Sequence, residues 1–136
     1  MIDNNNLGVV DAIGDKRWHN SDGKLHREDG PAFISFDDIA QMWFVNGLLH
    51  RVDGPAIVSK NDRKEWWING SRHRFDGPAL TMCVDGKTLT NEWWINGHEV
   101  TDKINKWVKE NDIDLGNLKE VDKALIKLVW ADYKNT

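Results

Sequence analysis

The sequence predicts a mainly β chain, an antiparallel meander of about four β-hairpins capped by two C-terminal helices. The first observation is the phrase His-Arg-x-Asp-Gly-Pro-Ala, which begins at His26, His50 and His73, with starts 24 and 23 residues apart. The second is a turn dipeptide, Asp-Gly or Asn-Gly, just before each copy. The third is a helical spacing of apolar residues that begins only after residue 100. A fixed period of this length is typical of repeat architectures, whose units bury one another.

The chain divides into three parts within one compact domain. Its 136 residues are enough for a single core. Residues 1–16 form a polar N-terminal lead-in with a short apolar patch from Leu7 to Val10, where we expect a frayed end or one extra strand. Residues 17–100 form the β-hairpin repeat region, and residues 101–136 form the helical cap.

Within each repeat, two β-prone runs joined by a polar turn predict a hairpin. The runs cover residues 32–36 and 41–45, then 57–58 and 65–68, then 80–84 and 92–95. Asn-Gly pairs close the aromatic runs at Asn46, Asn69 and Asn96 and supply the positive φ that tight turns need. The Asp-Gly-Pro step predicts a further bend, because proline fixes its own φ and has no N–H to donate.

The pattern becomes helical from residue 101. Thr101 is the predicted N-cap of a first helix, in which Ile104, Trp107 and Val108 share one face. Asn117 and Glu120 resemble a capping box before a second helix of about four turns. The apolar residues of this helix fall on two stripes: Val121, Leu125 and Leu128 on one, and Ile126, Val129, Trp130 and Tyr133 on the other. We expect the helices to cover the last hairpin; alternatively, the wide apolar surface also binds a partner or a second copy.

Composition narrows the class of protein. An apolar content of 40% with eight tryptophans argues against disorder. The net charge of −4 argues against a nucleic-acid partner, because such proteins usually carry a basic surface. Cys83 is the only cysteine, which fits a reducing compartment. The sequence has no apolar run of membrane-span length and no secretory signal pattern at its start. We therefore expect a cytoplasmic protein without a membrane partner.

The His-Arg pairs are the first candidate site. Successive histidines lie one repeat apart, roughly 10 Å in a meander, which is too far for one metal ion, and we predict neither a metal nor a cofactor. Structurally, each arginine is expected to pair with the aspartate two residues on, as in Arg27 with Asp29. The functional alternative is a clamp for a small ligand or nucleotide, formed by His50, Arg51, His73 and Arg74.

The aromatic doublets are the second candidate site. Neighbouring residues of a strand point to opposite faces, so Trp43, Trp66 and Trp93 are expected on one face of the sheet. Phe44, Trp67 and Trp94 are then expected on the other. A single-layer sheet buries only one face by itself, so one aromatic row is covered by another element or is a binding surface.

Enzyme motifs are missing from the sequence: there is no G-x-S-x-G, H-E-x-x-H, P-loop, G-x-G-x-x-G or C-x-x-C. Cys83 lies in an apolar run, which favours a buried, unreactive thiol over a catalytic nucleophile. The polar residues that stand out are repeated rather than unique, which favours a structural role for them. We therefore predict that the protein is not an enzyme.

The repeats resemble a known family. The segments WFVNGLLHRVDGPA and WWINGSRHRFDGPA are similar to the W-x-x-N-G-x-x-H-R-x-D-G-P-A repeats of small proteins from tailed bacteriophages and giant viruses. Those repeats are similar to MORN repeats in length and hairpin character. The resemblance covers residues 17–100, implies a viral β-hairpin repeat module, and brings no catalytic residues. The chain departs from the pattern at both ends, with Trp18 or His19 near the first expected tryptophan and Val100 at the fourth expected histidine.

These observations predict a non-enzymatic protein-interaction module, a viral protein that binds and modulates a host protein. Its expected contacts are the row Phe44, Trp67 and Trp94, or the helical tail at Ile126, Trp130 and Tyr133. One alternative is a small-ligand or nucleotide-binding protein that sequesters its ligand. Another is an assembly protein that forms homo-oligomers through the repeats or the tail.

Overall fold

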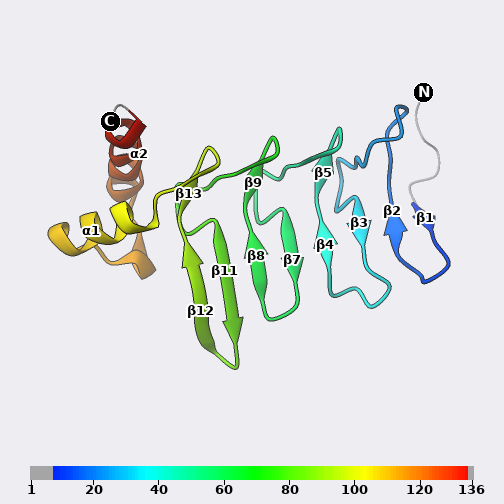
Figure 1. The fold of residues 1–136 in the computed structure, drawn as a ribbon, viewed down its shortest axis with the longest axis horizontal. Helices are drawn as coiled ribbons and strands as arrows, with labels where there is room; N and C mark the ends of the chain where they lie inside the picture. The colour runs from blue at the N-terminus through cyan, green and yellow to red at the C-terminus, as the bar shows by residue number, and fades with distance from the viewer. Residues whose placement is uncertain (1–7, 135–136) are drawn as a thin grey trace.

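The computed structural model describes the backbone of residues 8–134 and the side chains of residues 8–131. Its main element is an eight-stranded antiparallel sheet in which each hairpin lies beside the previous one (Figure 1). Two helices lie at the C-terminal end of the row (Figure 1). The predicted mainly β meander with two C-terminal helices is thus confirmed. In order across the sheet, the strands are β1 (Val9–Val10), β2 (Lys16–Arg17), β3 (Phe33–Ile34), β4 (Gln41–Met42), β7 (Ile57–Ser59), β8 (Arg63–Glu65), β11 (Leu80–Val84) and β12 (Lys87–Glu92).

Three small two-stranded ladders stand above this sheet, each closed by an Asn-Gly turn. They pair β5 (Phe44–Val45) with β6 (Leu48–Leu49), β9 (Trp67–Ile68) with β10 (Ser71–Arg72), and β13 (Trp94–Ile95) with β14 (His98–Glu99). Asn46 has φ 50° and Gly47 has φ 81°, the left-handed values that a two-residue hairpin turn requires. The lead-in supplies the extra strand expected there, since β1 pairs with β2; Leu7 lies outside the described residues.

Each His-Arg-x-Asp-Gly-Pro segment is a loop that leaves the sheet and returns to it, with both ends held by the backbone of one tryptophan. The carbonyl of Trp43 accepts a hydrogen bond from the N–H of His50 at 3.1 Å. The N–H of Trp43 donates to the carbonyl of Ala56 at 2.8 Å. The same two bonds recur at Trp18 and at Trp66. The sequence predicts one unbroken strand over residues 41–45, but the structure divides it at Trp43, because that residue bonds to both ends of the loop.

The two helices are α1 (Thr101–Asn111) and α2 (Glu120–Lys134), with a short 3-10 turn, η1 (Leu115–Asn117), between them. Ile104 of α1 and Ile126 of α2 are fully buried and pack with Trp93, Ile95 and Val100. The helices therefore cover the tryptophan of the last hairpin, where the Asp-Gly-Pro loop is missing from the sequence.

Both predicted helix caps are wrong. Val100 is the N-cap of α1, and Thr101 is already helical. The Thr101 hydroxyl instead accepts from the N–H of Trp93 at 3.0 Å and donates to Glu99 at 2.9 Å. At the start of α2, the side chain that reaches back is Asp122, which accepts from the N–H of Lys119, and not the predicted pair Asn117 and Glu120. In the part of the chain that the structure describes, no helix is long and apolar enough to span a membrane.

Candidate binding surfaces

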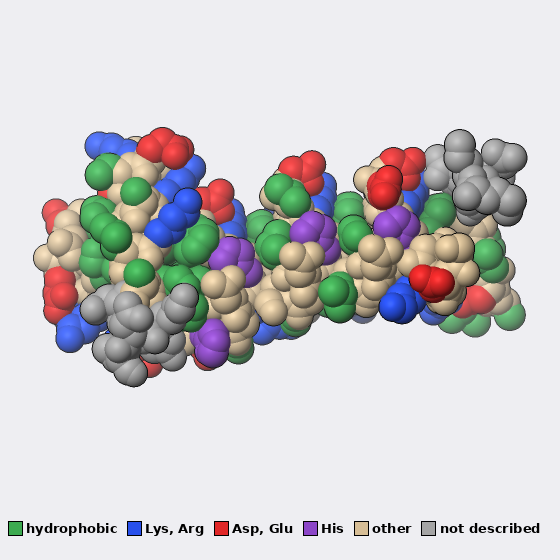
Figure 2. All heavy atoms as spheres, turned by 90° about the horizontal axis from the view of Figure 1, so that it is seen from above, with side chains coloured by type: hydrophobic (Ala, Val, Ile, Leu, Met, Phe, Trp, Pro, Cys, Tyr) green, Lys and Arg blue, Asp and Glu red, His purple; other side chains and the backbone are tan. Residues whose placement is uncertain are grey.

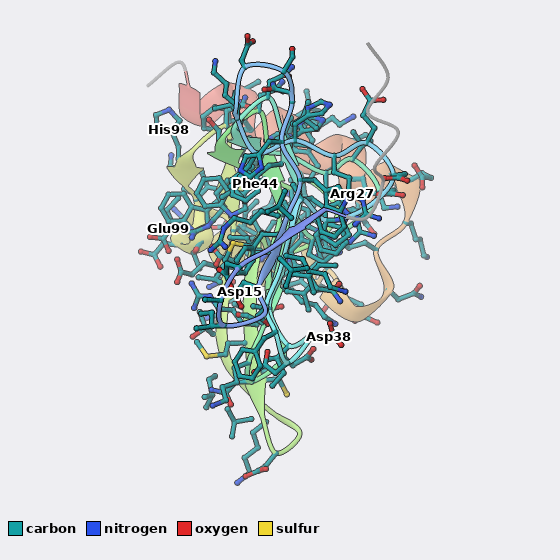
Figure 3. The ribbon with its side chains drawn as sticks, turned by 90° about the vertical axis from the view of Figure 1, so that its right-hand side faces the viewer. Asp15, Arg27, Asp38, Phe44, His98 and Glu99 are labelled. Carbon is teal, nitrogen blue, oxygen red and sulfur yellow. The ribbon has the colours of Figure 1, made fainter. Side chains whose placement is uncertain are left out.

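The sheet has two different faces, which alternation along the strands separates. We call the face of Trp18, Trp43, Trp66 and Trp93 the loop face, because the three loops stand out from it. We call the other, which carries Phe44, Trp67 and Trp94, the open face. Seen along the row of hairpins, Arg27 points to one side of the sheet, and Phe44 and Glu99 lie on the other (Figure 3).

On the loop face, the guanidinium of an arginine from each loop lies over the ring of the tryptophan that holds that loop. The guanidinium carbon is 3.9 Å from the ring centroid for Arg27 over Trp18, 4.0 Å for Arg51 over Trp43 and 3.8 Å for Arg74 over Trp66. A stacked guanidinium gains cation–π attraction and keeps its N–H groups free to point along the ring plane. Stacking thus fixes the arginine inside its loop.

The hydrogen bonds of these arginines confirm the predicted Arg–Asp pairs. Nε donates to the aspartate two residues on, at 2.9 Å for Asp29, 3.1 Å for Asp53 and 2.8 Å for Asp76. Nη1 donates to the proline carbonyl of the same loop, as Arg51 does to Pro55 at 3.1 Å. The stacking on tryptophan was not predicted, although a tryptophan stands eight or nine residues before each of these arginines.

The histidines join each loop to the following hairpin. Nδ1 accepts the backbone N–H of the turn asparagine one hairpin further on: His26 from Asn46, His50 from Asn69, and His73 from Asn96, each at 3.0 Å. An imidazole that accepts at Nδ1 carries its proton at Nε2 and is neutral. Burial lowers the pKa of His73 below its ordinary value, which favours this neutral form.

Two grooves lie between successive loops on the loop face. The groove of about 440 Å³ is lined by Arg51, Trp66, Ile68, His73 and Arg74, and the groove of about 830 Å³ by Arg27, Trp43, Val45, His50 and Arg51. Seen from above, ridges with acidic side chains at their tips stand out from the sheet, and hollows lie between them (Figure 2). The structure thus brings Arg51, His73 and Arg74 of the predicted ligand clamp into one groove, and His50 with Arg51 into the other.

The open face carries an apolar patch in the middle of the sheet. Cross-strand register places Phe33 opposite Met42, and Met42 opposite Ile57, and directly paired residues share a face. Phe44, two residues beyond Met42, pairs with Leu49 on the same face. These five side chains are half-buried. The apolar cluster around the helices includes Trp93 and Ile95 of the loop face, with Phe75 packed against it. None of the five residues of the open-face patch belongs to this cluster.

Beside this patch, Arg72 lies between two tryptophans of the predicted aromatic row. Its guanidinium carbon is 5.0 Å from the Trp67 ring centroid and 4.9 Å from that of Trp94. Arg72 also bonds to the buried carboxylate of Glu65, which accepts from Arg63 at 2.9 Å. Burial would raise the pKa of Glu65, but the bonds from Arg72 and Arg63 outweigh it and hold the pKa below its ordinary value. This cluster was not predicted from the sequence.

The predicted partner helix needs a correction. Ile126 is fully buried inside the chain, so it cannot contact a partner. Trp130 is partly buried against the same cluster. The exposed apolar stripe of α2 is the other one, with Val121 and Leu128 about two-thirds open to solvent. The side chain of Tyr133 lies outside the described residues. Cys83, expected to be buried, is half-buried in β11.

Among the described residues, no group of three or more His, Cys, Asp or Glu side chains could hold a metal ion. Within the described part of the chain, the grooves of the loop face and the apolar patch of the open face are candidate sites. Comparisons of the chain with protein-family models, curated proteins and solved structures found no match.

Proposed function

We propose that this protein is a non-enzymatic protein-interaction module, and that it is a viral protein which binds and modulates a host protein through the open face. The observation that carries the proposal is the apolar patch of Phe33, Met42, Phe44, Leu49 and Ile57 on a single-layer sheet. Burying a patch of this kind against a partner is favourable roughly in proportion to the apolar area removed from water.

The neighbouring residues give this patch the character of an interface. Trp67 and Trp94 flank it, and the guanidinium of Arg72 lies between their rings. Aromatic residues and arginine are the types enriched where binding energy concentrates. The carboxylate of Glu65 orients Arg72, which reduces the side-chain entropy lost on binding. The patch therefore combines an apolar centre with rigid, oriented polar neighbours.

We also propose that the hairpins are tandem units similar to MORN repeats, in line with the viral repeats that the sequence resembles. Three loops share the same arginine–tryptophan stack, the same Arg–Asp bond and the same histidine bond to the next hairpin. Stacked units that each bond to their neighbour build a rigid, extended face, which suits recognition of a protein more than enclosure of a substrate.

The test is affinity capture from host-cell lysate, read by mass spectrometry, with a matched pair of variants. Phe44→Asp places a charge in the patch, and Val52→Asp places the same charge on the loop face, where Val52 is 82% exposed. We expect one protein to be captured by the wild type and by Val52→Asp and lost with Phe44→Asp. Circular dichroism checks that both variants keep the fold. Capture that is the same for all three proteins would contradict a role for the open face.

Trp67→Ala and Trp94→Ala extend the test along the face. Each removes one of the two rings beside Arg72. We expect the affinity for the captured protein to fall by about tenfold or more in each, as for an interface residue of central importance. Unchanged affinity in both variants would overturn the proposal. The measurement is competition binding of the purified variants against the labelled wild type.

A further inference from the structure

The two grooves of the loop face are built from the same parts. Each has a tryptophan and a branched aliphatic side chain among its lining residues, Trp43 with Val45 or Trp66 with Ile68. Each has loops as walls, and the loop around Asp53 is the wall that both grooves share. Two such grooves side by side suit a ligand that repeats along its length.

Charge is layered in the walls, with carboxylates outside and arginines beneath. The aspartate side chains are 58%, 86% and 55% exposed at Asp29, Asp53 and Asp76, whereas the arginines bonded to them are 18%, 27% and 23% exposed. Glu28 adds a further carboxylate that is 85% exposed. An approaching ligand therefore meets negative charge first, and the guanidinium groups are already held by tryptophan, aspartate and a proline carbonyl.

Helix α2 places lysines beside the third loop. Beyond the third loop, Nζ of Lys127 on α2 lies over the ring of Phe75 at 5.3 Å from its centroid. Burial would raise the pKa of Asp76, but its bond from Arg74 outweighs this, and the charge of Lys123 on α2 adds to the lowering. Two lysines of α2 thus lie beside Phe75 and Asp76 of the third loop. Trp93 and Ile95, the counterparts of the groove floor, are covered by Ile104 and Ile126.

The spacing of the grooves sets the spacing of the ligand. The strands that carry Trp43 and Trp66 are separated by one strand, so the grooves lie about 10 Å apart at the usual strand separation of nearly 5 Å. A polyproline II segment rises about 3.1 Å per residue with three residues per turn, so every third side chain points the same way at roughly 9 Å intervals. In an extended strand, by contrast, residues three apart point to opposite sides.

We propose that the paired grooves bind a polyproline II segment of a partner protein that carries lysine or arginine at every third residue. Each cationic side chain lies in one groove, with its methylene stem against the tryptophan and the aliphatic residue and its charge beside the exposed aspartates. Aromatic-lined grooves are the usual receptors of polyproline II segments, because the preformed helix loses little entropy on binding. This site is separate from the open face and stands independently of the function proposed above.

Fluorescence anisotropy with a labelled nonapeptide, three repeats of Lys-Pro-Pro, tests the proposal. We expect this peptide to bind and the Glu-Pro-Pro peptide not to bind. A peptide with three lysines spaced by three prolines should bind about tenfold more weakly, because the two grooves cannot be filled together. Equal binding of the two lysine peptides would show that spacing plays no part and would overturn the proposal.

Charge variants at Val52 locate the binding. This residue lies in the wall between the grooves and is 82% exposed, so substitution there leaves packing intact. We expect Val52→Glu to tighten binding and Val52→Lys to weaken it, each by about two- to fivefold, the range of an exposed ion pair. Leu89 is 61% exposed on the distant β11–β12 hairpin, and Leu89→Glu and Leu89→Lys are the matched controls, which should change nothing.

Three results would sink the proposal. The first is an equal effect at Leu89 and Val52, which would mean attraction to net charge alone. The second is binding of inorganic tripolyphosphate that Val52→Lys strengthens, which would make the grooves an anion site. The third is loss of peptide binding in folded Phe44→Asp, which would place the peptide on the open face; retained binding in that variant keeps the two surfaces distinct.

Discussion

At the scale of single residues, three arginines hold the loops together from inside. Arg51 stacks on Trp43 and donates hydrogen bonds to Asp53 and to the carbonyl of Pro55. One side chain therefore links the tryptophan that holds the loop to two other residues of the loop. A lysine reaches a similar distance but has neither the plane that stacks nor the fixed directions of the guanidinium N–H groups. The side chain therefore acts as the small core of a loop that has few apolar residues.

Arg51→Lys is predicted to lower the free energy of unfolding by about 1–2 kcal/mol, through loss of stacking and of one hydrogen bond. Urea unfolding followed by tryptophan fluorescence measures the change. Lys87→Arg, a reverse exchange on an exposed strand, is the control and should leave stability unaltered. Equal free energies of unfolding for Arg51→Lys and the wild type would show that the stacked arginine does not stabilise the fold.

Protonation of His73 opposes folding. In the folded chain its Nδ1 accepts from Asn96, and its pKa is lowered by burial, so the unfolded chain binds more protons between the ordinary value near 6.5 and the lower folded value. Stability then rises with pH in that window, is complete above it, and is lost as pH falls through the folded pKa. Thermal unfolding of wild type and His73→Ala at several pH values should show a smaller loss on acidification in the variant. A parallel loss in both would contradict the mechanism.

At the scale of elements, Thr101 takes the place of a missing loop. At Trp43 and Trp66 the N–H donates to the alanine that ends the loop, whereas at Trp93 it donates to the Thr101 hydroxyl. Thr101→Val keeps the shape but leaves this N–H unpaired, and should cost about 1–3 kcal/mol, the penalty for an unsatisfied group. Thr101→Ser keeps the hydroxyl and should cost much less. Urea unfolding of both variants measures the difference; equal losses would point to packing instead of the hydrogen bond.

The elements themselves could largely be predicted from the sequence. Asn-Gly turns and β-prone runs locate the hairpins, because turn chemistry and side-chain alternation are local properties. The division of the aromatic strands could not be found this way, since it depends on Trp43 bonding to His50 and Ala56 across a loop. The inward stripe of α2 was also undetermined, because both stripes are apolar and only tertiary contact with Ile104 distinguishes them.

The candidate sites show the same division between local and tertiary information. Alternation predicted which aromatic residues share the face of Phe44, and the short Arg–Asp spacing predicted the bonds within the loops. The contact of Arg72 with Trp67 and Trp94 joins residues of neighbouring hairpins. In the previous hairpin, Leu49 occupies the position of Arg72. Its neighbour Glu65 likewise stands where the previous hairpin has Met42, so the repeat pattern itself gives no sign of a buried ion pair.

At the scale of the whole molecule, stability is expected to vary along the row of hairpins. The sheet is a single layer in which each hairpin bonds to the next, and the largest group of fully buried side chains lies at the helical end, around Trp93, Ile95, Ile104 and Ile126. A chain of this kind transmits a local loss of packing mainly to its neighbours, because distant units share no contacts.

Ile126→Ala is predicted to destabilise the helical end by about 2–5 kcal/mol, the cost of a cavity in a packed core. Hydrogen exchange read by mass spectrometry should quicken in α1, α2 and the β13–β14 ladder, and remain unchanged in β2, β3 and β4. Leu128→Ala on the same helix is the matched control, since Leu128 is 63% exposed and its removal should alter exchange little. Faster exchange throughout the sheet in Ile126→Ala would instead show that the hairpins and the helices unfold as one cooperative unit.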